Sequence, residues 1–219
     1  ERIVMYAPDK AEVWKIPGHY HHQLNWSQDG KSILALSSKF VPIDGVTMRV
    51  DLLRRIDLSG KVTGEISSQE IFEKLKITRI RTPFSWDQTL KNKVELEISH
   101  FNSFHEIPRL DRKSGNTNIK AGNYIASSTM SGTVIVDKDL KIPLEKITYP
   151  TSRDQAIHDV QLMPDGRILL LNNDQVRDMQ NTGPRSSVEF FDPVARKSTY
   201  TFQASPPEMF YTPFSGGVQ

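Results

Sequence analysis

The chain has 219 residues, of which 37% are hydrophobic and 25% charged, with a formal net charge of +2. This composition is typical of a chain that buries a core, and so small a net charge gives no reason to expect a nucleic-acid partner. Cysteine is absent, which excludes disulfides, thiolate metal sites and a cysteine nucleophile, and no apolar stretch is as long as a membrane span.

The first predicted elements are two strands and a turn in YAPDKAEVWKI (6–16), with Asp9 in the turn. A hairpin follows in HQLNWSQDGKSILALSS (22–38), where an Asp-Gly pair separates two apolar runs, a strong hairpin signal. A second hairpin, LLRRIDLSGKVTGEI (52–66), turns at Asp57. One helix is predicted next: Ser67 and Glu70 form a capping box, and Ile71, Phe72 and Leu75 share one face.

The same two kinds of hairpin recur along the chain. HFNSFHEIP starts at His100 and returns in GNYIASS (122–128), and the polar stretch 109–121 between them predicts a long exposed loop. GTVIVDKDLKIPLEKI (132–147) turns at Asp137. HDVQLMPDGRILLLNN (158–173) then forms another Asp-Gly hairpin, and SVEFFDPVARKSTYTF (187–202) turns at Asp192.

These hairpins indicate an internal repeat. The three turn aspartates fall 35, 37 and 34 residues after His22, His100 and His158. Four strands repeated in this way predict an all-β fold, a β-propeller with about three to four blades present and one short helix on its rim. We treat residues 1–219 as one propeller region, a piece of a longer chain and incomplete at both ends; a β-sandwich is the structural alternative. Missing blades or another chain should cover the open strand edges.

The repeat assigns equivalent positions to three histidines. If His22, His100 and His158 each begin the inner strand of a blade, all three face one central funnel and can share a site. The alternative is that each is a hydrogen-bonded structural residue. His19 and His21 complete the sequence H-Y-H-H, but without a carboxylate or thiol at ligand spacing we expect no dedicated metal site there. His105 is off this register and is predicted to be a surface or packing residue.

Three motifs together resemble the arylsulfate sulfotransferase family over about Trp14 to Gln219: H-D-x-x-x-x-P-D-G with I-L-L-L-N-N, H-F-N-S, and the terminal PPEMFYTPFSGGVQ. The resemblance implies a six-bladed propeller, exported to the periplasm or secreted by bacteria. It also implies transfer of a sulfuryl group from an aryl sulfate to a phenol, with no cofactor. A histidine carries the group transiently.

The resemblance also implies roles for particular residues. His158 matches the histidine that accepts the sulfuryl group, His100 and Asn102 match the pair that binds the sulfate oxygens, and His22 matches the histidine of the first histidine blade; all three histidines are candidate catalytic residues. An arginine tends to follow the paired serines of the family, whereas Thr129 follows Ser127 and Ser128 here.

Arg153 and Arg185 are candidate substitutes for that cation, and Tyr211 and Phe214 are candidates for an aromatic wall or for the core. A neutral imidazole is a competent nucleophile, and a second one can carry the phenol proton. The rival interpretation is a catalytically inactive propeller that serves as a binding or structural module. A third, a metal-dependent hydrolase, needs a carboxylate ligand that the sequence does not place.

Overall fold

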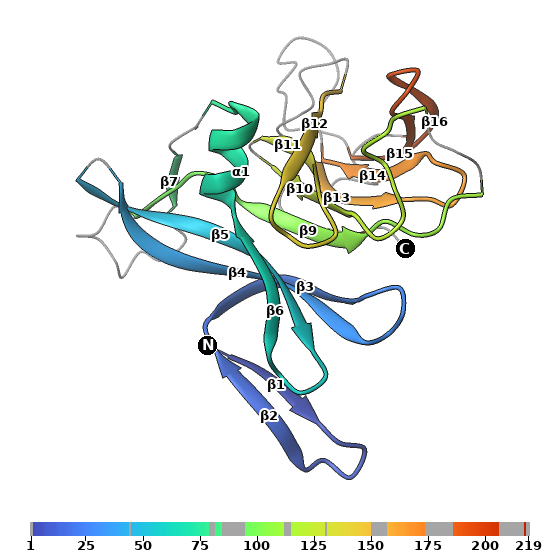
Figure 1. The fold of residues 1–219 in the computed structure, drawn as a ribbon. Coiled ribbons are helices and arrows are strands. Elements are labelled where there is room, and N and C mark those ends of the chain that lie inside the picture. The colour runs from blue at the N-terminus through green and yellow to red at the C-terminus, as the bar shows by residue number, and fades with distance from the viewer. Residues whose placement is uncertain are drawn as a thin grey trace.

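Three successive segments of the chain each form a four-stranded antiparallel meander in the computed structural model (Figure 1). The structure describes residues 2–43, 45–78, 82–84, 95–111, 115–129, 131–149, 157–173, 186–205 and 217. Within these residues the strands form four sheets accompanied by one helix, so the predicted all-β class is confirmed.

The first sheet contains a meander of β3 (His19–Trp26), β4 (Ser32–Ile43), β5 (Val46–Asp57) and β6 (Val62–Ser67). The second contains β9 (Phe101–Glu106), β10 (Tyr124–Ser128), β11 (Gly132–Val136) and β12 (Pro143–Ile147). The third contains β13 (Ile157–Leu162), β14 (Ile168–Asn172), β15 (Ser187–Asp192) and β16 (Lys197–Gln203). An N-terminal hairpin of β1 (Arg2–Tyr6) and β2 (Glu12–Pro17) forms a separate sheet. Every predicted hairpin is therefore confirmed.

Two short strands that were not predicted from the sequence extend the first sheet. β7 (Thr82–Phe84) pairs with β8 (Glu95–Glu97), and β8 lies parallel to the first half of the long strand β5. The second half of β5 pairs with β6 instead. This parallel pairing places Glu97 opposite Arg49, which matters for the site.

The turn aspartates of the repeat have a common physical role. The carboxylates of Asp57, Asp137 and Asp192 each accept hydrogen bonds from backbone N–H groups two to five residues further along the chain. Asp9 accepts one from Ala11 in the same way. Such contacts satisfy turn donors that have no strand partner, which explains why aspartate recurs at these positions.

The turns also correct the predicted alignment of the histidines. Each first hairpin closes with a hydrogen bond to the backbone carbonyl of an equivalent residue: Ser27, Ile107 or Met163. Five residues before each of these stand His22, Asn102 and His158. His100 therefore precedes the equivalent position by two residues, and the prediction that it is equivalent to His22 and His158 is wrong. The H-x-N spacing places Asn102, and not His100, at the repeat position.

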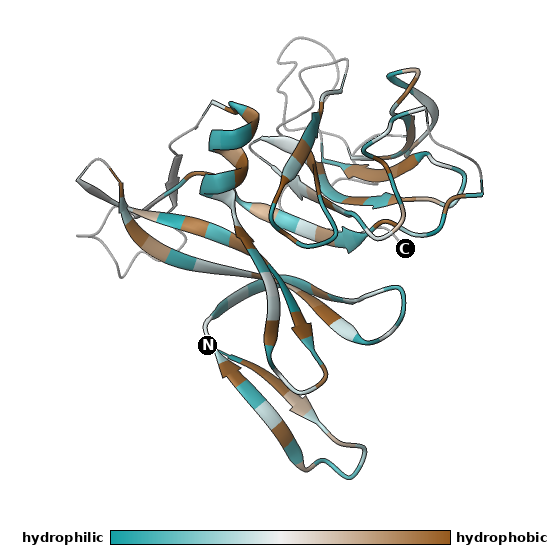
Figure 2. Cartoon of the chain, in the orientation of Figure 1, coloured by the Kyte–Doolittle hydropathy of each residue, from teal (hydrophilic) through white to brown (hydrophobic). Residues whose placement is uncertain are grey.

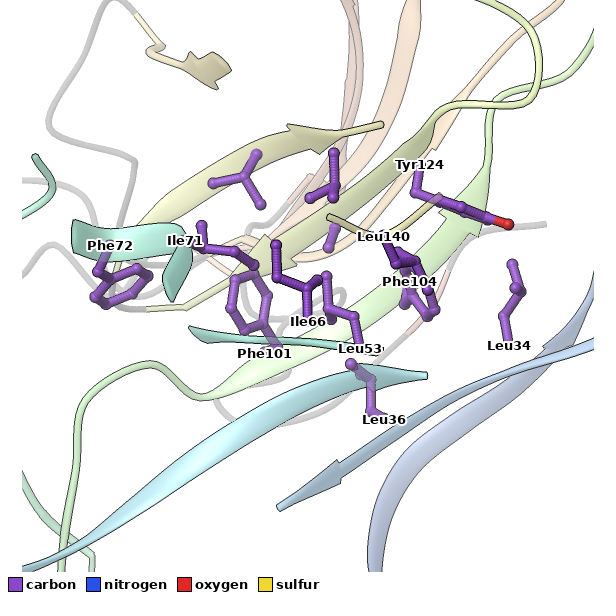
Figure 3. Close-up of a cluster of buried hydrophobic side chains, with 13 residues drawn as sticks. Leu34, Leu36, Leu53, Ile66, Ile71, Phe72, Phe101, Phe104, Tyr124 and Leu140 are labelled. Atoms are coloured by element: carbon purple, nitrogen blue, oxygen red, sulfur yellow. The ribbon is translucent and has the colours of Figure 1, made fainter. Parts of the chain in front are cut away.

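The apolar residues explain why the sheets pack in chain order. One core cluster joins the first and second sheets, with Leu53, Phe101 and Phe104 among its members (Figure 3). Another joins the second and third sheets, and a smaller one joins the N-terminal hairpin to the first sheet. In β10, Tyr124 belongs to the cluster between the first and second sheets, and Ile125 belongs to the cluster between the second and third. Successive side chains of a strand point to opposite faces, so both faces of β10 are buried.

A β-sandwich has two sheets packed on each other. Here the second sheet packs against the first on one face and against the third on the other. Figure 2 shows hydrophobic and hydrophilic residues following one another along the strands of the first sheet, whereas β14 is hydrophobic for most of its length. All five residues of β14 are buried, in agreement with that pattern.

The predicted helix is confirmed as α1 (Ser68–Leu75) with Ser67 as its N-cap. Both hydrogen bonds of the capping box with Glu70 are present, and Ile71 and Phe72 are buried against the second sheet. The prediction for residues 109–121 is correct only in part. Most of the described residues of that loop have exposed or half-exposed side chains, but Ile119 is buried in the cluster between the second and third sheets.

Candidate functional site

His158 occupies an irregular position in the first strand of the third sheet. Ile157 pairs with Asn172 and Asp159 with Leu171, so His158 is the extra residue of a β-bulge. A bulge redirects a side chain out of the regular alternation and is common beside functional sites. The side chain of His158 is buried, and its Nδ1 lies 2.8 Å from the Nδ2 amide nitrogen of Asn173.

The side-chain amide of Asn173 controls which nitrogen of His158 has a lone pair. In the orientation observed, the amide nitrogen donates to Nδ1, so the proton of a neutral imidazole is on Nε2. Turning the amide by half a rotation presents its oxygen instead, and Nδ1 then carries the proton and leaves Nε2 as the nucleophilic atom. Asn173, which lies directly after β14, is therefore part of the candidate site.

The corresponding irregularities in the other two sheets hold Asn102 alone in β9, and His22 together with Gln23 in β3. Asn102 is buried: Ser127 Oγ donates to its Oδ1 at 2.7 Å, and its Nδ2 donates to the backbone oxygen of Ile157 at 3.1 Å. That oxygen belongs to the residue before His158. Asn102 therefore ties the second sheet to the nucleophile candidate, and the second N–H of its amide has no partner among the described residues.

A second contact joins the first strands of all three meanders. Gln23 follows His22 and Asp159 follows His158, and the Nε2 of Gln23 donates to Oδ1 of Asp159 at 3.4 Å. His105 Nε2 lies 3.0 Å from that same oxygen. The prediction that His105 is a surface or packing residue is therefore wrong: it is a half-buried polar link that holds β3, β9 and β13 together.

Six residues form a closed loop of contacts beside this junction, which we call the histidine cluster: His21, His22, Arg49, Asp51, Glu97 and His100. His21 Nδ1 lies 2.7 Å from His22 Nδ1, and the imidazoles of His22 and His100 meet edge to face with centroids 5.2 Å apart.

Carboxylates complete the loop. His100 Nδ1 lies 2.9 Å from Glu97 Oε1, and His21 Nε2 lies 3.3 Å from Asp51 Oδ1. Arg49 bridges the two acids, 3.7 Å from Asp51 and 3.5 Å from Glu97. With neutral histidines the two carboxylates and one guanidinium give the cluster a net charge of −1.

Burial and neighbouring charges perturb two groups of the cluster. Burial of the His22 imidazole, followed by the charges of His21 and His100, lowers its pKa to about 3, although the residue as a whole is solvent-exposed. Burial alone would raise the pKa of Asp51, but the His21 imidazole that faces it, the charge of Arg49 and the Ser99 hydroxyl together lower it to about 2. At neutral pH Asp51 is therefore ionised and His22 is neutral.

The structure bears on the missing arginine of the family pattern. Thr129 donates its backbone N–H to the carbonyl oxygen of His100 at 3.3 Å, so this position does lie beside the cluster. The buried guanidinium of Arg49 lies in the cluster, with Asp51 and Glu97 as neighbours. The other predicted candidates, Arg153, Arg185, Tyr211 and Phe214, lie outside the described residues.

Sequence reasoning missed Arg49, Asp51, Glu97 and Asn173. For Arg49 and Asp51 the available signal was their alternation with apolar residues in the strand M-R-V-D-L (48–52). Charges buried in a strand are costly without partners, so this pattern predicts buried ion pairs. The partners themselves were not predictable, since Asp51 accepts from Ser99 Oγ and from the backbone N–H of Phe101, about fifty residues away.

In the part of the chain that the structure describes, no group of three or more histidine and acidic side chains is placed to hold a metal ion. Nor does any described helix combine the length and hydrophobicity needed to cross a membrane. No protein-family model matches the sequence, and no curated protein shows significant similarity to it.

Proposed function

We propose that the three meanders are blades of a β-propeller, and that this protein transfers a sulfuryl group from an aryl sulfate to a phenol through His158. The observation that carries the proposal is a repeated irregularity in the first strand of three successive sheets, which leaves out of the pairing Asn102, His158, and His22 together with Gln23. The consecutive packing of these sheets supports blades arranged around one axis.

The chemistry follows from these residues. Once the Asn173 amide turns its oxygen toward Nδ1, the Nε2 lone pair of the His158 imidazole attacks sulfur, the bond from sulfur to the phenolic oxygen breaks, and the phenolate leaves with the bonding electrons. We assign an N–H of Asn102 to a sulfate oxygen and His22 to the group that gives the phenolate a proton. In the second half of the cycle an acceptor phenol loses its proton to the same base and takes the sulfuryl group from His158. We also propose, on the family resemblance, that the protein acts in the periplasm or outside the cell.

A second candidate function is favoured by the charge balance of the site. Arg49 is the described cation of the histidine cluster and has two carboxylate neighbours, and Thr129 replaces the arginine of the family pattern. A cluster of net charge −1 repels a sulfate ester unless it first takes up a proton. The alternative is therefore a propeller that retains these contacts as a structural or binding module without catalysis.

A colorimetric transfer assay distinguishes the two. The protein is mixed with 4-nitrophenyl sulfate and an excess of phenol, and release of nitrophenolate is followed with and without the acceptor. We expect acceptor-dependent release that falls at least about a hundredfold in His158→Asn. Asparagine is the residue at the equivalent bulge of β9, so this substitution suits the local backbone.

The matched control is His19→Asn, which changes an exposed histidine on β3 and should retain the activity of the wild type. Release that is absent from the folded wild-type protein, or that survives unchanged in His158→Asn, would overturn the proposed function. Absence in the wild type would favour the non-catalytic module.

A further inference from the structure

The contact between His21 and His22 joins two equivalent atoms. Their Nδ1 nitrogens lie 2.7 Å apart, which is a hydrogen-bond distance that requires one proton between the two atoms. Either His21 donates and His22 accepts, or the reverse. A neutral imidazole has one N–H and one lone pair. If Nδ1 of a neutral ring donates, its Nε2 therefore has the lone pair; if Nδ1 accepts, its Nε2 carries the proton.

Asp51 determines the direction of this hydrogen bond when both rings are neutral. The Asp51 carboxylate is buried and ionised, and His21 Nε2 is the ring nitrogen that faces it, in an ion-pair contact of 3.3 Å, so the negative charge of Asp51 favours the single proton of a neutral His21 on Nε2. His21 Nδ1 is then an acceptor, His22 Nδ1 must donate, and His22 Nε2 carries a lone pair. If His21 takes up a proton, its Nδ1 becomes a donor, His22 Nδ1 accepts, and His22 Nε2 carries an N–H.

We propose that His21 and His22 form a proton relay anchored by Asp51, in which a proton taken up at His21 converts His22 Nε2 from an acceptor into a donor. Neither state requires His22 to become charged. As a mechanism for acid–base catalysis the relay rests on the proposed function, but its two states are properties of the unliganded protein. In this scheme His21 and Asp51 are positioning residues and His22 is the group that meets the phenol.

The pair lies among charged side chains and is most deeply buried at its Asp51 end. Side-chain exposure is 2% for Asp51 and 15% for His21, and His22 is exposed as a residue although its imidazole is largely buried, so the relay leads from a buried anion toward the surface. The groups facing it are Asp51 and Arg49 from β5, His100 before β9, and through His100 the carboxylate of Glu97. A proton on His21 lies beside Asp51 and brings the charge of the cluster from −1 to 0.

The relay balances both halves of a transfer cycle. As the bond between sulfur and the phenolic oxygen breaks, the leaving phenolate takes the proton from His22 Nε2. The proton on His21 Nδ1 moves at the same time to His22 Nδ1, and both rings are then neutral. When the acceptor phenol attacks, its proton goes to His22 Nε2, and the proton on His22 Nδ1 returns to His21. The net change over the cycle is zero.

Nuclear magnetic resonance tests the relay in the unliganded protein. Long-range proton–nitrogen correlation spectra of the ¹⁵N-labelled chain report which imidazole nitrogens carry protons, and His22→Gln assigns the signals. At high pH we expect His22 protonated on Nδ1 with Nε2 unprotonated. As the pH is lowered, His21 should become doubly protonated, and His22 should switch to Nε2–H with the same midpoint while staying neutral.

Two variants provide the controls. His21→Phe removes the partner of Nδ1, so His22 should lose the switch and titrate as an independent group; His19→Gln, on the same strand, should leave the switch unchanged. Independent titration of His21 and His22 in the wild type, or His22 with Nε2 protonated at high pH, would overturn the relay. The wild-type titration decides the matter even if His21→Phe does not fold.

The transfer assay separates this inference from the function on which it rests. If both hold, the pH profile of kcat should lose one limb in His21→Phe. A tautomer switch without transfer would leave the relay standing and reject the sulfotransferase. Transfer without the switch, and with an unaltered pH profile in His21→Phe, would retain the enzyme and reject the relay.

Discussion

Substituting Asp51 by asparagine should cost stability in a way that depends on pH. Asp51 is 2% exposed, accepts from Ser99 Oγ at 2.7 Å and from the backbone N–H of Phe101 at 2.8 Å, and lies beside Arg49 and His21. Asparagine keeps the shape of the side chain and one acceptor oxygen but removes the charge. The effect of the substitution therefore measures what that charge contributes to folding.

The pKa of Asp51 gives the magnitude. It falls from an ordinary 3.8 to about 2 in the folded protein, and one pKa unit corresponds to about 1.4 kcal/mol, so the charge stabilises the fold by about 2 kcal/mol. A carboxyl with a lowered folded pKa contributes this fully above 3.8 and loses it as the pH falls through 2. The difference in unfolding free energy between wild type and Asp51→Asn should therefore be about 2 kcal/mol at pH 7 and roughly half of that at pH 3.

Urea-induced unfolding followed by tryptophan fluorescence at pH 7, 5 and 3 measures this difference. The exposed turn residue Asp9 supplies the control: Asp9→Asn keeps an oxygen for the backbone N–H of Ala11 and should stay within about 0.5 kcal/mol of the wild type. A cost for Asp51→Asn that is the same at pH 7 and pH 3, or below about 0.5 kcal/mol at pH 7, would refute the assignment of a buried, ionised Asp51.

Three further substitutions test the packing. Phe101→Ala should lower the unfolding free energy by about 3–5 kcal/mol in urea, because the ring is fully buried between two sheets, whereas the exposed Phe202→Ala should cost under about 1 kcal/mol; equal costs would contradict the core assignment. Gly60→Ala should cost about 1–3 kcal/mol in thermal unfolding, since φ is 85° and the new methyl would lie 2.9 Å from Trp14; no loss would contradict this approach. Ser67→Ala should cost about 1 kcal/mol by losing the helix cap, and an unchanged melting temperature would argue against the capping box.

Local sequence chemistry was sufficient to predict the hairpins and the helix. The turn aspartates and the Asp-Gly pairs are satisfied within a few residues, so their hydrogen bonds could be anticipated without knowledge of the fold. The capping box at Ser67 and Glu70 is local in the same sense. The repeat of four strands, and hence the all-β class, could be predicted from these elements.

The site was harder to predict because its contacts are not local. Aligning on histidines alone placed His100 at the repeat position, and only the register of the hairpins shows that Asn102 belongs there. The link between Arg49 and Glu97 depends on β8, a strand of three residues that pairs in parallel with β5 and has no distinct sequence pattern. Short parallel pairings of this kind are set by tertiary packing and not by local propensity.

The proposed role of His158 is tested most directly by locating the sulfuryl group itself. The wild-type chain is mixed briefly with an aryl sulfate in the absence of an acceptor phenol, its intact mass is recorded at neutral to alkaline pH, and the modified peptide is then identified. We predict a gain of one sulfuryl group on the peptide that contains His158, absent from His158→Asn and removed when phenol is added. No gain in a folded protein, or a gain on another residue, would contradict the account.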